Sequence, residues 1–286
     1  MPGPASSRIP QILGPMVAVA IAAASLVAVP SSPAGATTPR YRFFQFNMCG
    51  NICNEGGTAV VGAVRNSIFD FHPHAVSLNE ACRSQYRRLL DLLDGSEWDM
   101  RGRFAVTRTG VESCGGSEKF GIAVLTVKPI TWARRWKLPS PKGEARKLLC
   151  VTTRMARRAT RVCSTHITTG AHPVYQNKEI RKVKRTVTPW VKNGRPVVLM
   201  GDFNVVPTDN TLDRIYAPGH GGGSFGVFQE VDEGPDYCRC GEPTLGSQKI
   251  DYVFLSARHW RSLWGNATHT DYSDHVPLRG SAARQG

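Results

Sequence analysis

A short segment in the second half of the chain joins a predicted buried strand to two polar residues that could act on a phosphate. Residues 197–200 are apolar, and Gly201 permits a tight bend at their end. Asp202 and Asn204 follow two apart, so both side chains point to the same side of an extended chain. A carboxylate and a carboxamide placed in this way could orient a water molecule or hold a phosphate. Asp and Asn are also common in turns, so this segment alone leaves a plain strand exit equally open.

Further ionisable and amide side chains lie at or beside the ends of other predicted strands. These residues are Asn47, Glu80, His166, Asp251, Asp274 and His275. If one edge of the fold gathers them with Asp202 and Asn204, the site contains four carboxylates, two amides and two imidazoles. Each residue alone has a structural explanation, as an acid at a helix start, a hydrogen-bonded histidine or a buried acid. A structural role for all of them at once is a much weaker explanation.

The first predicted elements alternate between strands and helices. Residues 41–47 predict a strand, and Thr58 is a suitable N-cap for a helix whose apolar residues follow a stripe. Pro73 ends this helix before a short strand at 75–78, and a second apolar stripe predicts a helix at 86–93. This order is typical of an α/β protein.

The middle of the chain contains short predicted strands separated by turns. They lie at 104–106, 121–127, 148–153 and 160–165, and such a run of hairpins indicates antiparallel sheet. An arginine-rich turn at 154–158 forms one hairpin tip.

The last third adds a helix, a long loop and two more strands. Residues 180–187 place apolar residues on one helical face and Lys and Arg on the other, which is typical of a solvated helix. Residues 218–246 are rich in Gly and Pro and predict a loop, which a buried strand at 250–255 and a short strand at 276–278 follow. Mixed strands in two sheets with helices outside make an α/β sandwich.

Residues 1–36 have the features of a secretory signal peptide. Arg8 precedes an apolar run at 16–29, and a small-x-small cleavage site ends at Ala36. The apolar run is shorter than the roughly 20 residues of a membrane-spanning helix, so an uncleaved anchor is the less favoured alternative. We therefore predict a secreted protein that is cleaved after Ala36.

The remaining residues, 37–286, suit one large domain, with two small domains as the alternative. The full chain has 36 Lys and Arg against 22 Asp and Glu, and removal of Arg8 leaves 35 − 22 = +13. This charge favours polyanions such as nucleic acid, anionic lipid or cell-wall polymers, although many secreted proteins are basic for solubility alone. No feature implies a protein partner or stable membrane insertion, so we expect a monomer.

Eight cysteines follow the predicted signal peptide, an even number that indicates disulfides formed after export. A zinc site is less favoured, because no Cys or His cluster has ligand spacing. The flanks of Cys150 and Cys163 predict two strands of one hairpin, which makes these two residues a pair. Cys49–Cys53 and Cys82–Cys114 are further candidate pairs, and Cys238–Cys240 would close a very small ring.

Six segments resemble, in their order along the chain, those of the metal-dependent endonuclease/exonuclease/phosphatase superfamily. They are Phe46-Asn47, Leu78-Asn79-Glu80, Ser164-Thr165-His166, Gly201-Asp202-Phe203-Asn204, Ile250-Asp251-Tyr252 and Ser273-Asp274-His275. The superfamily includes pancreatic-type deoxyribonuclease, abasic-site endonucleases, neutral sphingomyelinases and inositol-polyphosphate phosphatases. One departure is Asn79, where the family usually has Gln. The resemblance implies a four-layer α/β/β/α sandwich of two mixed, mainly antiparallel sheets with helices outside.

The resemblance also implies a metal site and a water-activating residue. Asn47, Glu80 and Asp274 would bind Mg²⁺, with Mn²⁺ or Ca²⁺ as alternatives, and hard cations of this kind require oxygen ligands. Asp202 would orient or deprotonate the attacking water, and Asn204 would form a hydrogen bond with the phosphate.

Two histidines complete the implied site. His275 would contact the phosphate, with its tautomer fixed by Asp251. His166 would help to protonate the leaving oxygen, a role that suits an imidazole with a near-neutral pKa. In having a histidine at this position, the chain resembles the deoxyribonuclease and sphingomyelinase branches of the superfamily.

These features together predict a secreted, Mg²⁺-dependent phosphodiester hydrolase, a nuclease that acts on DNA with low sequence specificity. The candidate contacts to the substrate phosphates are Arg157, Arg158, Arg181 and Arg185.

Two other classes of function stay open. The substrate could be a phospholipid, as for a sphingomyelinase, or an inositol phosphate, and Trp132 and Trp136 lie on one side of an extended segment where they could touch a membrane. A non-catalytic polyanion-binding protein is the remote alternative. The presence of Glu80, Asp202 and His275 argues against it.

Overall fold

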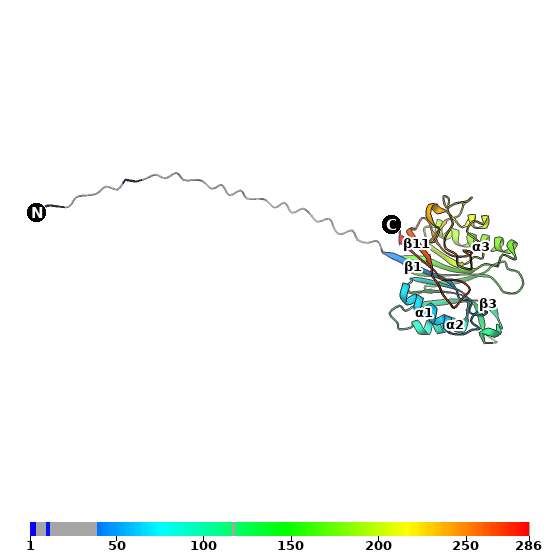
Figure 1. The fold of residues 1–286 in the computed structure, drawn as a ribbon. Coiled ribbons are helices and arrows are strands. Elements are labelled where there is room, and N and C mark those ends of the chain that lie inside the picture. The colour runs from blue at the N-terminus through cyan, green and yellow to red at the C-terminus, as the bar shows by residue number, and fades with distance from the viewer. Residues whose placement is uncertain (4–9, 12–38, 116–117, 286) are drawn as a thin grey trace. The chain divides into compact units, whose positions relative to one another are not determined.

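Two six-stranded sheets face each other in the computed structural model, and helices cover their outer faces (Figure 1). The structure describes residues 1–3, 10–11, 39–115 and 118–285. Apart from residues 1–3 and 10–11, the predicted signal peptide lies outside the described residues. Thr38–Gly286 form one compact unit.

The first sheet brings the beginning and the end of this unit side by side. Its strands are, in order, β11 (Trp260–Ala267), β12 (Leu278–Arg284), β1 (Arg40–Asn47), β2 (Ala75–Cys82), β4 (Lys119–Thr126) and β3 (Arg101–Thr109). β1 and β2 pair in parallel, and the other neighbours pair antiparallel. Two helices, α1 (Ala59–Phe71) and α2 (Arg83–Leu93), pack on the outer face of this sheet.

The second sheet contains the segment with Asp202 and Asn204. Its strands are, in order, β5 (Trp132–Lys137), β6 (Lys147–Met155), β7 (Arg158–His166), β8 (Val197–Asp202), β10 (Asp251–Ser256) and β9 (Phe228–Glu230). β7 and β8 pair in parallel through the crossover helix α3 (Pro173–Lys192), and the other neighbours pair antiparallel. Short 3₁₀ turns lie at Glu112–Cys114, Asn210–Arg214 and Pro235–Tyr237.

Strand β8 shows why the apolar runs of the sequence are continuous. Val197 and Leu199 pack beneath α3, whereas Val198 and Met200 point into the layer between the two sheets. Successive side chains of a strand alternate between its faces, so a strand covered on both faces is apolar at every position. A third apolar layer lies beneath α1 and α2.

The structure confirms the predicted four-layer α/β/β/α sandwich of mixed, mainly antiparallel sheets. The extended segment that contains Trp132 and Trp136 is β5, although its Arg and Lys residues interrupt any apolar run, and the sequence does not indicate β11. The predicted strand at 276–278 is wrong, because β12 begins at Leu278 and continues through small residues. Gly280 is one of these, and a side chain there would meet Val231. The predicted loop at 218–246 contains the short strand β9.

All eight cysteines form disulfides, in the pairs Cys49–Cys53, Cys82–Cys114, Cys150–Cys163 and Cys238–Cys240. The predicted hairpin pair is confirmed, since Cys150 and Cys163 lie directly opposite each other on β6 and β7. The first two disulfides hold the segments that follow β1 and β2. Among the described helices, none has the length and apolar character needed to cross a bilayer.

Candidate active site

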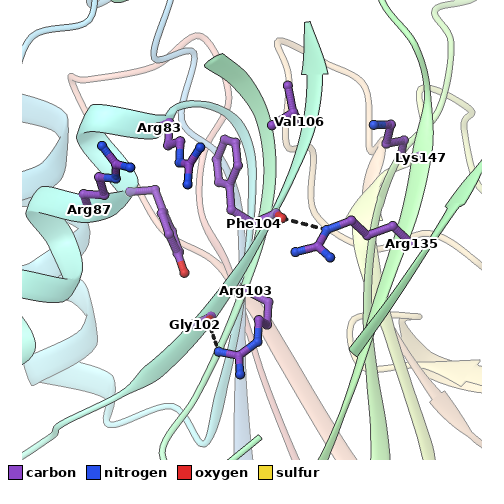
Figure 2. A pocket seen from close by; sticks show the side chains of 9 residues that line it. Arg83, Arg87, Gly102, Arg103, Phe104, Val106, Arg135 and Lys147 are labelled. Carbon is purple, nitrogen blue, oxygen red and sulfur yellow. Dashed lines mark hydrogen bonds between the residues drawn. The ribbon is translucent and has the colours of Figure 1, made fainter. Parts of the chain in front are cut away.

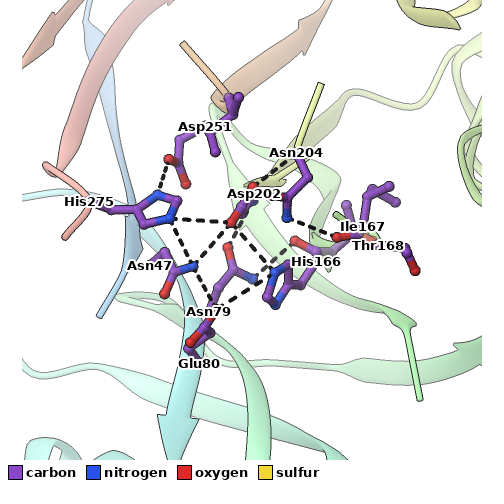
Figure 3. Close-up of polar contacts among 12 residues, drawn as sticks. Asn47, Asn79, Glu80, His166, Ile167, Thr168, Asp202, Asn204, Asp251 and His275 are labelled. Atoms are coloured by element: carbon purple, nitrogen blue, oxygen red, sulfur yellow. Dashed lines mark hydrogen bonds and ion pairs between the residues drawn. The ribbon is translucent and has the colours of Figure 1, made fainter. Parts of the chain in front are cut away.

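The parallel strand pairs bring the predicted site residues to one edge of the sandwich (Figure 3). Asn47, His166 and Asp202 are the last residues of β1, β7 and β8. Glu80 lies near the end of β2. Because neighbouring parallel strands end on the same side of a sheet, their last residues lie together. Asp251 begins the antiparallel strand β10 and is paired directly with Asp202.

Asn47 connects the two sheets at this edge. Its side-chain nitrogen Nδ2 donates to Glu80 Oε1 and to Asp202 Oδ2, each at 3.1 Å. The same nitrogen lies 3.4 Å from His275 Nε2. Asn47 Oδ1 accepts a hydrogen bond from the Cys49 amide at 3.1 Å. The amide therefore fixes the positions of three other predicted site residues.

Glu80 lies at an irregularity in the first sheet. Its φ of 54° is in the left-handed region, and the register of β2 with β4 shifts between Leu78 and Ala81. The Gly50 amide donates to the Glu80 carbonyl oxygen at 2.8 Å. Positive φ is uncommon for a residue with a side chain, and such strain is often found at functional sites. Burial raises the pKa of the Glu80 carboxyl, and the Asn47 hydrogen bond opposes this effect.

Asp202 is buried at the centre of the site. Its Oδ1 accepts a hydrogen bond from the backbone amide of Asn204 at 2.9 Å. Its Oδ2 lies 3.5 Å from His166 Nε2 and 3.7 Å from His275 Nε2. Burial, reinforced by the negative charge of Asp251, raises the pKa of Asp202 to about 8. At neutral pH the side chain is therefore mainly protonated in the absence of a metal ion. Its carboxylate form can accept a proton from water, as a general base must.

The predicted contact between Asp251 and His275 is present. Asp251 Oδ2 and His275 Nδ1 are 2.7 Å apart, and Gln45 donates to the other Asp251 oxygen at 3.1 Å. Burial opposes the charged form of the imidazole, but the hydrogen bond and charge of Asp251, with a contribution from Asp202, raise the pKa of His275 to about 9. The ring is therefore protonated at neutral pH, and its Nε2 proton faces the site, where it can stabilise negative charge on a phosphate.

His166 differs from the sequence-based prediction in its protonation. Arg146 Nη1 lies 2.9 Å from His166 Nδ1, and a guanidinium can only donate, so the ring proton is on Nε2. Burial and the positive charge of Arg146 lower the pKa of His166 well below its usual value. The predicted near-neutral pKa is therefore wrong for this environment. His166 is a neutral hydrogen-bond donor that faces Asp202 and Glu80.

Asn204 and Asp274 lie at the rim of the site. Asn204 has a φ of 51°, and its carbonyl oxygen accepts a hydrogen bond from Gln176 at 2.7 Å, which joins the rim to the first turns of α3. Asp274 is exposed beside the Cys49–Cys53 disulfide. Its charge is close enough to act on the Glu80 carboxyl.

The four predicted substrate-binding arginines do not join this cluster. Arg158 begins β7 and His166 ends it, so the tip with Arg157 and Arg158 is about 26 Å from His166 along the strand. Arg181 and Arg185 lie on α3, about 8 and 14 Å along the helix axis from Gln176. This placement does not fit a substrate contact by Arg157 and Arg158 at the catalytic edge.

Three residues of the site are not indicated by the sequence as functional. Asn79 Oδ1 accepts hydrogen bonds from Gln45 at 2.6 Å and from the Asp202 amide at 2.9 Å. Gln45 alternates with Asn47 on β1, and this alternation is the one signal that could have placed it at the site. Arg146 comes from the segment before β6, and the sequence around it carries no comparable signal.

The donors at this edge fit a hard divalent cation. Glu80 offers a carboxylate that is 24 % exposed, and Asn47, whose nitrogen faces that carboxylate in this structure, would bind a cation through its oxygen Oδ1. Within the described part of the chain, no Lys or Arg forms an ion pair with Glu80, Asp202 or Asp251, and His275 is the cation that faces them. The excess negative charge suits a divalent cation with oxygen ligands. Asn47 and Glu80 would hold it, with Asp274 at the rim.

The sequence matches the Endonuclease/Exonuclease/phosphatase family over residues 44–275. A search of curated proteins gave no significant match. The catalytic domain of human Nocturnin with bound sulfate is similar in fold, with a TM-score of 0.68 at 14% identity over 86% of this chain and 94% of that chain.

Two other solved structures are similar at comparable levels. An endonuclease/exonuclease/phosphatase from Beutenbergia cavernae DSM 12333 has a TM-score of 0.62 at 21% identity over 86% of this chain and 72% of that chain. Truncated TDP2 from Caenorhabditis elegans has a TM-score of 0.64 at 12% identity over 85% of this chain and 97% of that chain. Such identities show the fold alone. The family match spans most of the sequence, and the chain therefore belongs to the endonuclease/exonuclease/phosphatase family, whose members are hydrolases that act on phosphoester bonds with divalent metal ions.

Proposed function

We propose that this protein is a secreted, Mg²⁺-dependent phosphodiester hydrolase that cleaves DNA with little sequence preference. The observation that carries the proposal is the cluster in which Asn47 donates to Glu80 and Asp202, while His275 and His166 face Asp202. It combines a basic carboxylate, a protonated imidazole and a neutral imidazole donor within a few ångströms. These groups meet the needs of phosphodiester hydrolysis by water.

Each side chain has a role that follows from its protonation. Asp202 accepts a proton from the attacking water in its carboxylate form, which a divalent cation nearby would favour over the protonated form. His275, protonated through its contact with Asp251, and His166, with its proton on Nε2, donate hydrogen bonds to phosphoryl oxygens. A divalent cation at Glu80 and Asn47 would polarise a phosphoryl oxygen and neutralise developing charge.

The choice of nucleic acid over lipid depends on charge and on the tryptophans. The full chain has a formal net charge of +14, which favours a polyanionic substrate. Trp132 and Trp136 are half-buried and pack against a third tryptophan. Their rings lie 6.1 and 5.7 Å from that of Trp190 on α3, and the Arg161 guanidinium covers Trp132 at 3.6 Å. The feature that favoured the lipid alternative is thus used in packing.

Cleavage of plasmid DNA by the purified protein tests this proposal. We expect nicking and linearisation with Mg²⁺ and none with a chelator. Asp202→Asn should reduce the rate at least about 100-fold, because it removes the proton acceptor without changing the side chain's shape. Asp271→Asn, at an exposed position, is the matched control. Intact plasmid under all conditions would refute the proposal, and release of phosphocholine from sphingomyelin vesicles without DNA cleavage would favour the lipid alternative.

Secretion has its own test. The full-length chain, expressed in a bacterial host with an intact export pathway, should appear in the medium with Thr37 as its first residue. N-terminal sequencing of the exported protein measures this directly. Retention of residues 1–36 on a membrane-bound form would favour the uncleaved anchor instead.

A further inference from the structure

A cavity of about 400 Å³ lies beside the catalytic edge, between α2 and the outer strands of the two sheets. Figure 2 shows Arg83 and Arg87 projecting from α2 on one side, and Arg135 and Lys147 from strands on the other. Arg103, on β3, completes a ring of five cationic side chains. The volume lies in the range of about 300–1,000 Å³ that is usual for ligand sites.

The positive charges of this cavity are not neutralised by protein carboxylates. Among the described residues, no ion pair joins any of the five cations to an Asp or Glu. Arg135 donates to the Phe104 carbonyl oxygen at 2.9 Å and Arg103 to that of Gly102 at 2.8 Å. Burial, with the charges of Arg135 and Lys137, lowers the pKa of Lys147. Like charges gathered in this way favour a bound anion.

Two aromatic rings provide an apolar wall between the cations. Tyr86 and Phe104 have ring centroids 5.1 Å apart, and Phe104 lies between the cationic groups in Figure 2. A side chain at Gly102 would meet the Tyr86 hydroxyl oxygen at 2.6 Å, so the glycine makes room for this ring. Tyr86 and Phe104 are 8 and 9 % exposed, so only a small part of each ring lines the cavity beside the cations. Cations next to aromatic atoms are a combination that binds nucleic acid strands.

The cavity is connected to the catalytic edge through two short links. Lys147 follows Arg146, whose guanidinium is hydrogen-bonded to His166. Arg83 begins α2 three residues after Glu80. A strand with its reacting phosphate beside Glu80 and His166 could therefore continue into the cavity. The hairpin tip with Arg157 and Arg158 has no such connection.

We infer that this cavity binds a nucleotide of the substrate strand that flanks the bond to be cleaved, with the arginines on its phosphates and the aromatic wall against its base or sugar. This inference rests on the proposed nuclease function. It adds a second contact region, remote from the reacting phosphate, that provides affinity without base readout.

The test compares two double variants with the same change in charge. Arg87→Ala/Arg103→Ala removes two exposed cavity arginines, and Arg157→Ala/Arg158→Ala removes two from the far end of β7. Binding of a fluorescein-labelled single-stranded DNA of about 12 nucleotides is measured by anisotropy in chelator, so that no cleavage occurs. We expect the cavity variant to bind about tenfold more weakly, and the slope of log K against log salt to fall by about 1.4. Lys147→Gln, a single change in the same cavity, should lower that slope by about 0.7.

The hydrolysis of bis(p-nitrophenyl) phosphate separates this inference from the proposed function. The ratio of DNA cleavage to hydrolysis of this small diester should fall in the cavity variant and stay constant in the Arg157→Ala/Arg158→Ala variant. A wild-type protein that hydrolyses the small diester but neither binds nor cleaves DNA would refute the nuclease proposal and the cavity with it. Wild-type DNA cleavage with equal DNA binding by both double variants would refute the cavity alone.

Discussion

The buried amide of Asn79 gives the sharpest prediction about how the site is held together. Its Oδ1 accepts hydrogen bonds from Gln45 Nε2 and from the Asp202 amide, and its Nδ2 donates to the Thr165 carbonyl oxygen at 3.0 Å. These partners lie on β1, β8 and β7, and Asn79 itself is on β2. One side chain thus joins both parallel strand pairs across the sandwich. Asn79→Leu keeps the size of the side chain and removes these three hydrogen bonds, together with a longer one from Nδ2 to Ser164 Oγ at 3.5 Å.

The expected cost follows from the groups that this change leaves without partners. The Asp202 amide and the Thr165 carbonyl lose a partner inside the protein, at about 1–3 kcal/mol each, while Gln45 keeps its bond to Asp251. The added apolar burial of leucine offsets about 1–2 kcal/mol. We therefore expect unfolding to become easier by about 3 kcal/mol. For a domain of this size that corresponds to a fall in melting temperature of roughly 6–12 °C.

Scanning calorimetry through the melting transition measures the change in stability, and DNA hydrolysis at a temperature well below that transition measures the change in activity. The hydrolysis rate should fall at least about tenfold in the folded variant, because the backbone of Asp202 is no longer fixed relative to β2. Asn66→Leu, at an exposed position on α1, is the control. If Asn79→Leu melts within about 2 °C of the wild type and keeps full activity, the amide does not position Asp202 and the reasoning fails.

Three further predictions address the backbone, the acid stability and the metal. Gly201→Ala should destabilise the fold by about 3 kcal/mol or more, since the φ of Gly201 is +149° and the new methyl group would overlap a carbonyl oxygen of β7. Unfolding in urea measures this loss. Gly62→Ala, where α1 has open space for a methyl group, is the control and should be neutral or stabilising. Burial and the charge of Arg42 lower the pKa of His74 to about 4, below its value in the unfolded chain. The free energy of unfolding should therefore fall by about 1–2 kcal/mol as the pH is lowered from about 6.5 to 4. His74→Asn keeps an acceptor for the backbone amide of Arg42 and should reduce this loss, as measured by unfolding at pH 7 and pH 4.5. Glu80→Gln should raise the Mg²⁺ concentration for half-maximal hydrolysis at least about tenfold, and an unchanged Mg²⁺ dependence would remove Glu80 from the metal site.

Residue patterns were sufficient to predict the layers and the edge at which the candidate site residues gather. The apolar run before Asp202 indicates a strand buried on both faces, and the polar residue at its end marks the edge. The same pattern at Asn47 and His166, combined with the family resemblance, places all three at one end of their strands. This part of the prediction succeeded because strand ends are local features of the sequence.

Other features of the site depend on contacts between distant segments. Asn79 looks like an ordinary polar residue of a short strand, and its importance follows from partners on three other strands. The neutral state of His166 results from burial and from Arg146, which no local pattern connects with it. Protonation therefore requires the packed structure, even where the residue type is evident from the sequence.

The basic charge of the chain illustrates the same limit for substrate binding. Composition favours a polyanion, but it does not say which of 36 Lys and Arg would meet it. The runs that attract attention, at the tip with Arg157 and Arg158, lie a whole strand away from His166. Arg83 and Lys147 are far apart in the sequence and yet line one cavity, because α2 and β6 both start at the catalytic edge. Strand register, rather than the local density of charge, decides which cations can contact a strand held at the site.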